Sequence, residues 1–180
     1  MKRRSSVQQL TFSALLTTLM LILGYIESRL PVPGLPGVKL GLSNSVLMLS
    51  LYWMGLPSTL LLMLLKVLLS GLLFGGVTGM LYAFAGGLTS VLLMALLIRT
   101  GVFSPVGVGI AGAAMHNIAQ VLCAMWVLHT GNLVYYMAIL VLIAAVTGIA
   151  TGTVARLLMK HIPPAVRRKV RRRDSSENDG

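Results

Sequence analysis

The placement of charged residues constrains this chain more than any other feature. Residues 100–155 contain no Asp, Glu, Lys or Arg, and neither do residues 5–26, 40–65 and 67–98. A helix that crosses the hydrocarbon core of a bilayer needs about 20 apolar residues. Only 11% of the residues are charged and 56% are hydrophobic, whereas soluble domains carry about 25% charged residues. The sequence therefore predicts an integral membrane protein.

Clusters of glycine, proline and small polar residues divide these uncharged runs into shorter segments. They lie at residues 55–57, 75–79, 100–105 and 129–132. We therefore predict an all-α bundle of about six transmembrane helices, with approximate bounds 8–27, 40–54, 57–74, 79–99, 105–129 and 133–160. The second segment is short enough to be a re-entrant fragment instead, which would reduce the count to five.

The basic residues gather at the two ends of the chain and predict its orientation. Lys2, Arg3 and Arg4 precede the first apolar run, and most other Lys and Arg residues lie between 156 and 173. Loops rich in Lys and Arg stay in the cytoplasm. We therefore predict a basic cytoplasmic N-terminus (1–7), one transmembrane domain (8–162) and a polar cytoplasmic tail (163–180), in the cytoplasmic (inner) membrane. A cleaved signal peptide is the alternative for the first run, but no small-x-small site precedes Glu27.

The tail sequence VRRKVRRR, at residues 166–173, raises the question of a nucleic-acid partner. It follows directly after a predicted membrane helix, and it contains no aromatic residue that could stack on a base. Each base near an anionic bilayer surface contributes about 1 kcal/mol of attraction. We therefore expect anionic lipid, and no nucleic acid, as the partner of this tail.

Polar residues inside the predicted helices are the candidates for binding a substrate. Lys66 lies near the middle of the third predicted helix, and His116, Asn117 and Gln120 lie near the middle of the fifth. A lysine at the bilayer centre costs about 2.5–3.5 kcal/mol on insertion scales, so such residues face the protein interior or a wet cavity. Snorkelling of Lys66 toward the headgroups is one alternative. The other is that the fifth-helix residues only form interhelical hydrogen bonds.

The segment between Glu27 and Asn44 holds three prolines, three glycines and the only acid outside the last seven residues. With the predicted orientation it is external, and we predict that it covers a cavity that Lys66, His116 and Gln120 line at similar depth. Glu27, Lys39 and Asn44 would then contact the substrate. Since Lys39 and Lys66 outnumber Glu27, an anionic or carbonyl-rich ligand is favoured. An ordinary proline-rich loop is the alternative.

The sequence also argues against several kinds of chemistry. A Mg²⁺-dependent transferase needs clustered carboxylates, which one internal acid cannot supply. CxxC, HExxH and GxSxG patterns are absent, and Cys123 is the only cysteine. We therefore predict no catalytic residues, no metal and no cofactor.

Small residues in the first predicted helix could receive another helix. Ser13 and Thr17 are four residues apart, as are Ala14 and Thr18, and such spacing permits close helix contact. A partner protein that contacts Ser13 and Thr17 and a contact within the chain are both open.

Two segments, GVKLGLSN (37–44) and HNIAQ (116–120), carry a resemblance to a known family. The chain resembles the Gx transporter family, also labelled heptaprenyl diphosphate synthase component I. That family is in turn similar to the substrate-binding components of energy-coupling-factor transporters. The resemblance implies a bundle that captures a vitamin-like or cofactor-precursor-like small molecule and works with a membrane coupling subunit and ATPases. The alternative that its label implies is a non-catalytic membrane component of heptaprenyl diphosphate synthase.

Overall fold

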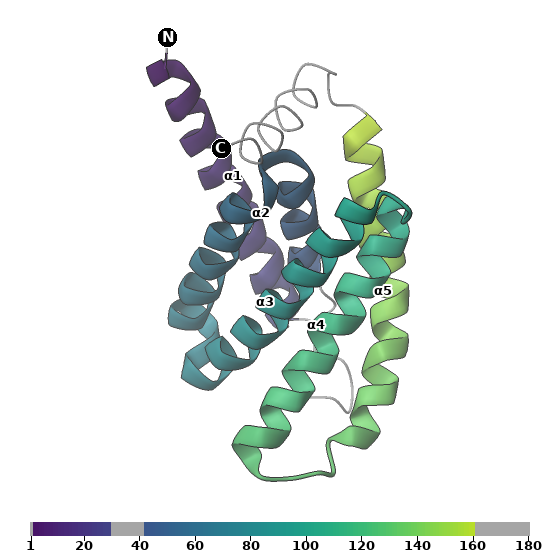
Figure 1. Ribbon diagram of the computed structural model, residues 1–180. Helices are drawn as coiled ribbons and strands as arrows, with labels where there is room; N and C mark the ends of the chain where they lie inside the picture. The colour runs from purple at the N-terminus through teal and green to yellow at the C-terminus, as the bar shows by residue number, and fades with distance from the viewer. Residues whose placement is uncertain (1, 30–41, 161–180) are drawn as a thin grey trace, which may run out of the picture.

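The computed structural model describes residues 2–29 and 42–160, and within these ranges all regular structure is helical. The elements are five α-helices and one π-helical turn (Figure 1). In chain order they are α1 (Lys2–Arg29), α2 (Leu42–Ser70), η1 (Gly71–Gly75), α3 (Gly76–Thr100), α4 (Pro105–Leu128) and α5 (Val134–Lys160).

Helix α2 is broken near its middle. Gly55 has φ 77° and ψ 177°, a conformation that only glycine adopts easily, and Pro57 follows it. Ser50 and Thr59 face each other across the break with their hydroxyl oxygens 3.0 Å apart. The chain therefore reverses here, where the sequence predicted the end of one helix and the start of the next.

The connection from α2 to α3 is the π turn η1, which is followed by Gly76. Gly76 has φ 65° and ψ 174°, which is not a helical conformation, and it donates its backbone N–H to the Gly71 carbonyl. A Cβ atom on Gly71 would overlap the Met80 side chain. The helical path therefore breaks at Gly76, within the turn that the sequence predicted at residues 75–79, and Gly71 lets the start of α3 pack closely against the end of α2.

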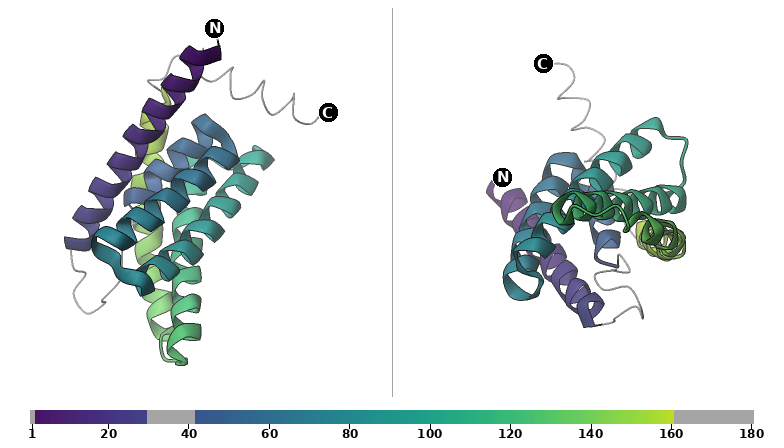
Figure 2. Two further views of the ribbon diagram at one scale, coloured as in Figure 1. Left: turned by 90° about the vertical axis from the view of Figure 1, so that its left-hand side faces the viewer. Right: turned by 90° about the horizontal axis from the view of Figure 1, so that it is seen from below.

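Each helix packs mainly on the next one along the chain, and α5 also reaches back to α2. Figures 1 and 2 show α1 beginning and α5 ending at the same end of the molecule, with the α4–α5 loop at the opposite end. The core lies between the helices and includes Met20, Leu47, Met48, Val91 and Val108, all at most 1% exposed.

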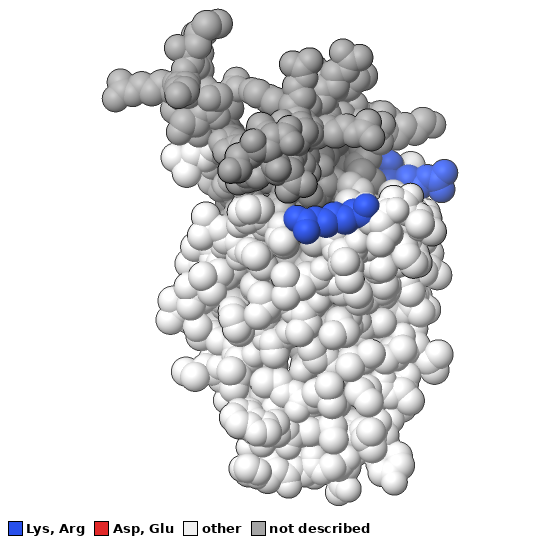
Figure 3. Space-filling model, viewed as in Figure 1, with Lys and Arg blue, Asp and Glu red and all other residues white. Residues whose placement is uncertain are grey.

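The outer surface is apolar, as expected for a protein that faces lipid. Val77, Trp126 and Tyr135 are each at least three-quarters exposed. On the face in Figure 3, the visible Lys and Arg atoms lie toward the end where α1 begins and α5 ends. Four stretches of the described residues are long and apolar enough to cross a membrane, namely Leu10–Arg29, Ser43–Thr100, Pro105–Leu128 and Met137–Leu157. These observations support a multi-pass membrane protein; the count of about six spans and the orientation stay predictions.

Candidate functional site

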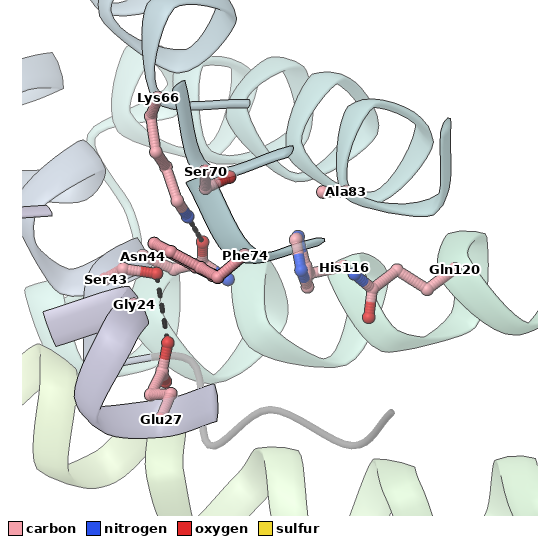
Figure 4. Close-up of a pocket in the computed structure, with 10 residues that line it drawn as sticks. All are labelled: Gly24, Glu27, Ser43, Asn44, Lys66, Ser70, Phe74, Ala83, His116 and Gln120. Carbon is pink, nitrogen blue, oxygen red and sulfur yellow. Dashed lines mark hydrogen bonds between the residues drawn. The ribbon is translucent and has the colours of Figure 1, made fainter. Parts of the chain in front are cut away.

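A small cavity lies where α1, α2, η1, α3 and α4 meet (Figure 4). Its volume is about 20 Å³, which is enough for about one water molecule. Three lining residues, Gly24, Phe74 and Ala83, are not polar. The polar lining residues are Glu27, Ser43, Asn44, Lys66, Ser70, His116 and Gln120.

Glu27 brings the end of α1 to the start of α2. It is only 3% exposed, and its Oε2 accepts a hydrogen bond of 3.2 Å from the Ser43 hydroxyl. Since α2 begins at Leu42, Ser43 lies in the first helical turn. Its hydroxyl thus binds the carboxylate of another helix.

Lys66 and Asn44 both belong to α2, 22 residues apart, and the break at Gly55 brings them together. The Lys66 Nζ atom donates a hydrogen bond of 3.2 Å to the Asn44 Oδ1 atom. Figure 4 shows the lysine side chain directed toward Asn44 in the cavity. The amine is therefore directed into the cavity in this structure, and the choice between a binding role and snorkelling stays a prediction.

His116 and Gln120 enter the cavity from one face of α4, and Gly86 on α3 makes room for them. A Cβ atom on Gly86 would lie 2.7 Å from the Gln120 Cγ, 2.8 Å from the His116 carbonyl oxygen and 2.9 Å from its Nδ1. Gly86 was not predicted from the sequence. The signal that could have found it is the Gly86-Gly87 pair within a long apolar run, since small residues let membrane helices approach closely.

Phe74, on the π turn, closes the cavity from the side of α1. A Cβ atom on Gly24 would lie 3.9 Å from its ring, which is ordinary van der Waals contact, so the phenyl group lies directly beside α1. The ring also packs edge-on against Tyr25, with a centroid distance of 5.9 Å. Neither Gly24 nor Phe74 was predicted from the sequence, because an apolar residue in an apolar run carries no signal of its own.

Of the predicted substrate-binding residues that the structure describes, Asn117 is not part of the cavity lining. Asn117 is buried, and its Nδ2 donates a hydrogen bond of 3.0 Å to the Leu140 carbonyl on α5. It therefore joins two helices, which was the alternative that the sequence left open. Lys39 lies outside the described residues.

The predicted partner contact on α1 is only partly available. Thr17 is 5% exposed, and its hydroxyl donates to the Ser13 carbonyl at 2.9 Å. Ala14 and Thr18 are exposed instead. The small-residue face at Thr17 thus packs within the chain, and a partner on this helix would meet the other face.

The lining of the cavity suits hydrogen bonding and charge pairing with a small polar molecule. It holds one carboxylate, one amine, one imidazole, two amides and two hydroxyls. Within the described residues, no three His, Cys, Asp or Glu side chains lie close enough to hold a metal ion. Cys123 is a free thiol on α4 and is not among the lining residues.

Comparison with known proteins gives one match. A family model described as heptaprenyl diphosphate synthase component I matches residues 16–158. No curated protein and no solved structure matches the chain.

Proposed function

The chain belongs to the heptaprenyl diphosphate synthase component I family, and from that premise we propose that it is a non-catalytic membrane subunit that binds a small molecule for uptake. The sequence segments that end at Asn44 and begin at His116 are the ones that resemble this family. The proposed ligand is vitamin-like or cofactor-precursor-like, and the proposed site is the cavity between α1, α2, η1, α3 and α4.

The observation that carries the proposal is the meeting of Glu27 and Lys66 in one cavity. They are a buried carboxylate and a partly buried amine within a predominantly apolar bundle. Desolvation of such ions costs several kcal/mol each. Ionisable residues within membrane helices most often mark a substrate or ion pathway. Convergence from α1 and α2, together with His116 and Gln120 from α4, supports a binding site.

The cavity must enlarge to accept an organic ligand. Its volume of about 20 Å³ is far below the roughly 300 Å³ or more of typical ligand pockets. Phe74 is the lining side chain best placed to move, because it lies on a π turn between two helices. π-Helical turns are frequent at functional sites. Withdrawal of the phenyl ring from Gly24 would open the cavity toward α1.

Other subunits would supply the energy for uptake. The sequence contains no phosphate-binding loop ending in Gly-Lys-Ser or Gly-Lys-Thr, the pattern that cradles ATP phosphates. A membrane coupling subunit and ATPases would therefore act with this chain. Among the exposed small residues of α1, Ala14 and Thr18 are the candidates for the contact.

We further propose that the chain crosses the membrane about six times with both ends in the cytoplasm. The stretch Ser43–Thr100 has 58 residues, about 87 Å as a straight helix, against a hydrocarbon core of about 30 Å. Its breaks at Gly55 and at η1 allow three crossings.

The orientation can be tested with two single cysteines in a Cys123→Ala background. Gly131→Cys lies in the α4–α5 loop and Val102→Cys in the α3–α4 loop. A membrane-impermeant maleimide should label residue 131 in intact cells and residue 102 only after permeabilisation. The reverse pattern would mean that the orientation is opposite to the proposed one. Labelling of both residues from outside would show that α4 does not span the membrane.

The binding function can be tested by native mass spectrometry of the protein in lipid nanodiscs. Wild type should retain a small molecule, and Lys66→Met should reduce its affinity at least tenfold, about 1.4 kcal/mol. Arg99→Met is the matched control, because it removes an exposed positive charge that does not line the cavity. Equal retention by Lys66→Met at normal thermal stability would remove Lys66 from the site. If none of the three proteins retains a small molecule, the proposed capture of a small molecule is contradicted.

The family description favours a second candidate function. The words 'component I' in the family description imply that the synthase has a second component. In this second candidate function, the chain is the membrane partner of a prenyl diphosphate synthase. The lining has one carboxylate, too few for the carboxylate cluster that holds catalytic Mg²⁺, so the partner would carry the chemistry. Purification from native membranes separates the two candidates. A prenyl synthase subunit bound in fixed ratio would support the second, and ATPase subunits would support the first.

A further inference from the structure

We propose that the end of the molecule formed by α4, α5 and their loop is anchored in the headgroup region of the bilayer, and that Trp126 and Tyr135 make this contact. The inference does not depend on the proposed uptake of a small molecule, and it holds for either orientation of the chain in the membrane.

The two aromatic side chains lie at the same end of the molecule and are highly exposed. Trp126 is in the last turn of α4 and is 75% exposed. Tyr135 is in the first turn of α5 and is 78% exposed. Figure 1 shows the loop between these helices at the end opposite to the start of α1. Both side chains are therefore available to whatever surrounds this end of the molecule.

Trp and Tyr suit the boundary between headgroups and hydrocarbon. Each combines a large apolar ring with a polar N–H or O–H group, and both are enriched where a membrane meets water. On one side of Trp126 and Tyr135 lies the loop HTGN, residues 129–132, which carries polar side chains. On the other side the exposed residues are aliphatic, such as Leu122 at 51% and Ile139 at 49%. The two aromatic residues thus lie where the surface changes from polar to aliphatic.

The lengths of α4 and α5 place the opposite boundary consistently. Arg156 is exposed on α5, about 21 residues after Tyr135, or about 32 Å along the helix. No residue between them is charged. The same interval separates Pro105, the first residue of α4, from Trp126. Since the hydrocarbon core is about 30 Å thick, a bilayer with one boundary at the two aromatic residues has its other boundary at Arg156 and the start of α4.

The anchor also gives the depth of the cavity wall that α4 provides. Along α4, Gln120 precedes Trp126 by about 9 Å and His116 precedes it by about 15 Å. Both residues line the cavity, and these distances along the helix are the largest depths that they can have below the boundary at Trp126. For the proposed function, this means that the ligand binds below the headgroups, between this boundary and the middle of the bilayer.

Fluorescence quenching by brominated phospholipids tests the anchor, because the chain has two tryptophans. Trp53, the other one, packs against Phe12 with a centroid distance of 5.2 Å. In the full-length Trp53→Phe variant, Trp126 is the single tryptophan, and the substituted ring stays aromatic. Lipids that carry bromine at different depths should place its indole about 15 Å from the bilayer centre, which is half the thickness of the hydrocarbon core. If Trp53→Phe does not fold, the difference between wild type and Trp126→Phe gives the same depth.

Three results of this experiment would overturn the proposal. Strongest quenching by bromines near the bilayer centre would show that this end is buried in the hydrocarbon. Quenching of Trp126 by aqueous iodide, but not by any brominated lipid, would show that it projects into water. Protection from both quenchers would show that another protein chain covers it. No ligand takes part, so none of these results bears on whether the cavity binds a small molecule.

A second measurement tests whether the two aromatic residues set the depth of this end. A spin label on Gly131→Cys, in a Cys123→Ala background, reports the depth of the α4–α5 loop. Replacing Trp126 and Tyr135 together by Leu keeps apolar bulk and removes both polar groups, so the label should move toward the hydrocarbon. It should then collide more often with oxygen and less often with a water-soluble nickel chelate. Exchanging the pair, Trp126→Tyr with Tyr135→Trp, should keep the wild-type depth, and so should Leu142→Ala, which removes a 70% exposed aliphatic side chain from the same helix. An unchanged label depth in the double leucine variant would contradict the anchoring role.

Discussion

Helix α4 has two sides that are packed in opposite ways. Toward α5 it is held by backbone contact, because a Cβ atom on Gly109 would lie 2.8 Å from the Gly148 carbonyl oxygen. A Cβ atom on Gly148 would lie 2.5 Å from the Ile110 Cα. Small residues let helices approach this closely, and the packing leaves no space between them.

On its other side, α4 meets a cavity. His116 and Gln120 extend into it, and polar side chains from α1 and α2 fill the opposite wall. One helix can thus line the cavity with one face because its other face is packed tightly against α5. Backbone contacts with α5 border α4 on one side, while side chains and the π turn border it around the cavity. Three substitutions test this division.

The largest effect is expected at the α4–α5 contact. A Cβ atom on Gly152 would lie 2.5 Å from the Val106 Cα and 2.9 Å from the Pro105 carbonyl oxygen. Backbone atoms cannot rotate away, so Gly152→Ala should force the helices apart and cost about 2–3 kcal/mol, as overpacking of a tight core does. Thermal unfolding of the ligand-free protein in nanodiscs measures this loss of stability.

Gly79→Ala is the matched control for that experiment. Gly79 is also helical, but nothing lies within 4 Å of its Cβ position. This substitution should leave stability unchanged or slightly raised, because alanine is the better helix former. Equal stability of the two variants would show that the α4–α5 contact is not the rigid part of the molecule.

Much of the chain's organisation could be predicted from local sequence signals. Uncharged runs and backbone breakers indicated the membrane helices, and the reversal near Gly55 and the loops after Thr100 and Leu128 fall close to the predicted turns. The cost of burying charge indicated Lys66, and the proline- and glycine-rich segment between Glu27 and Asn44 indicated Glu27; both residues line the cavity. These predictions needed only the residues themselves and their spacing along one helix.

Features that depend on helix rotation and on neighbouring helices could not be predicted in this way. Asn117 is about 100° around the helix from His116, so a modest rotation of α4 decides which of them faces the cavity. Small residues lie on two faces of α1, and nothing local shows that Thr17 packs inward. Gly86 and Phe74 become recognisable only when the opposite helix is present.

The second substitution tests the cavity side of α4. Gly86→Ala would place a Cβ atom 2.8 Å from the His116 carbonyl oxygen and 2.7 Å from the Gln120 Cγ. The Gln120 side chain can rotate, but the carbonyl cannot, so α4 must shift by a few tenths of an ångström. We expect ligand affinity to fall about tenfold, or about 1.4 kcal/mol. Calorimetric titration with a small molecule that binds wild-type protein measures this change.

The adjacent Gly87 supplies the control for Gly86. A Cβ atom there would lie 3.1 Å from the end of the Met63 side chain, which is flexible and does not line the cavity. Gly87→Ala should therefore keep wild-type affinity, whatever small change it makes to stability. Loss of affinity in both variants would mean that binding depends on general packing of α3, not on the positions of His116 and Gln120.

The smallest effect is expected at Asn117, the polar contact on the α5 side. Asn117→Leu keeps a similar volume and removes the 3.0 Å hydrogen bond to the Leu140 carbonyl. Hydrogen bonds between membrane helices contribute about 0.6 kcal/mol on average, so thermal stability should fall slightly and ligand affinity should stay unchanged. Gln120→Met, one helical turn away on the cavity face, should show the opposite pattern of normal stability and weaker binding. If Asn117→Leu instead loses affinity at normal stability, Asn117 contacts the ligand as the sequence first suggested, and the two sides of α4 are not separate.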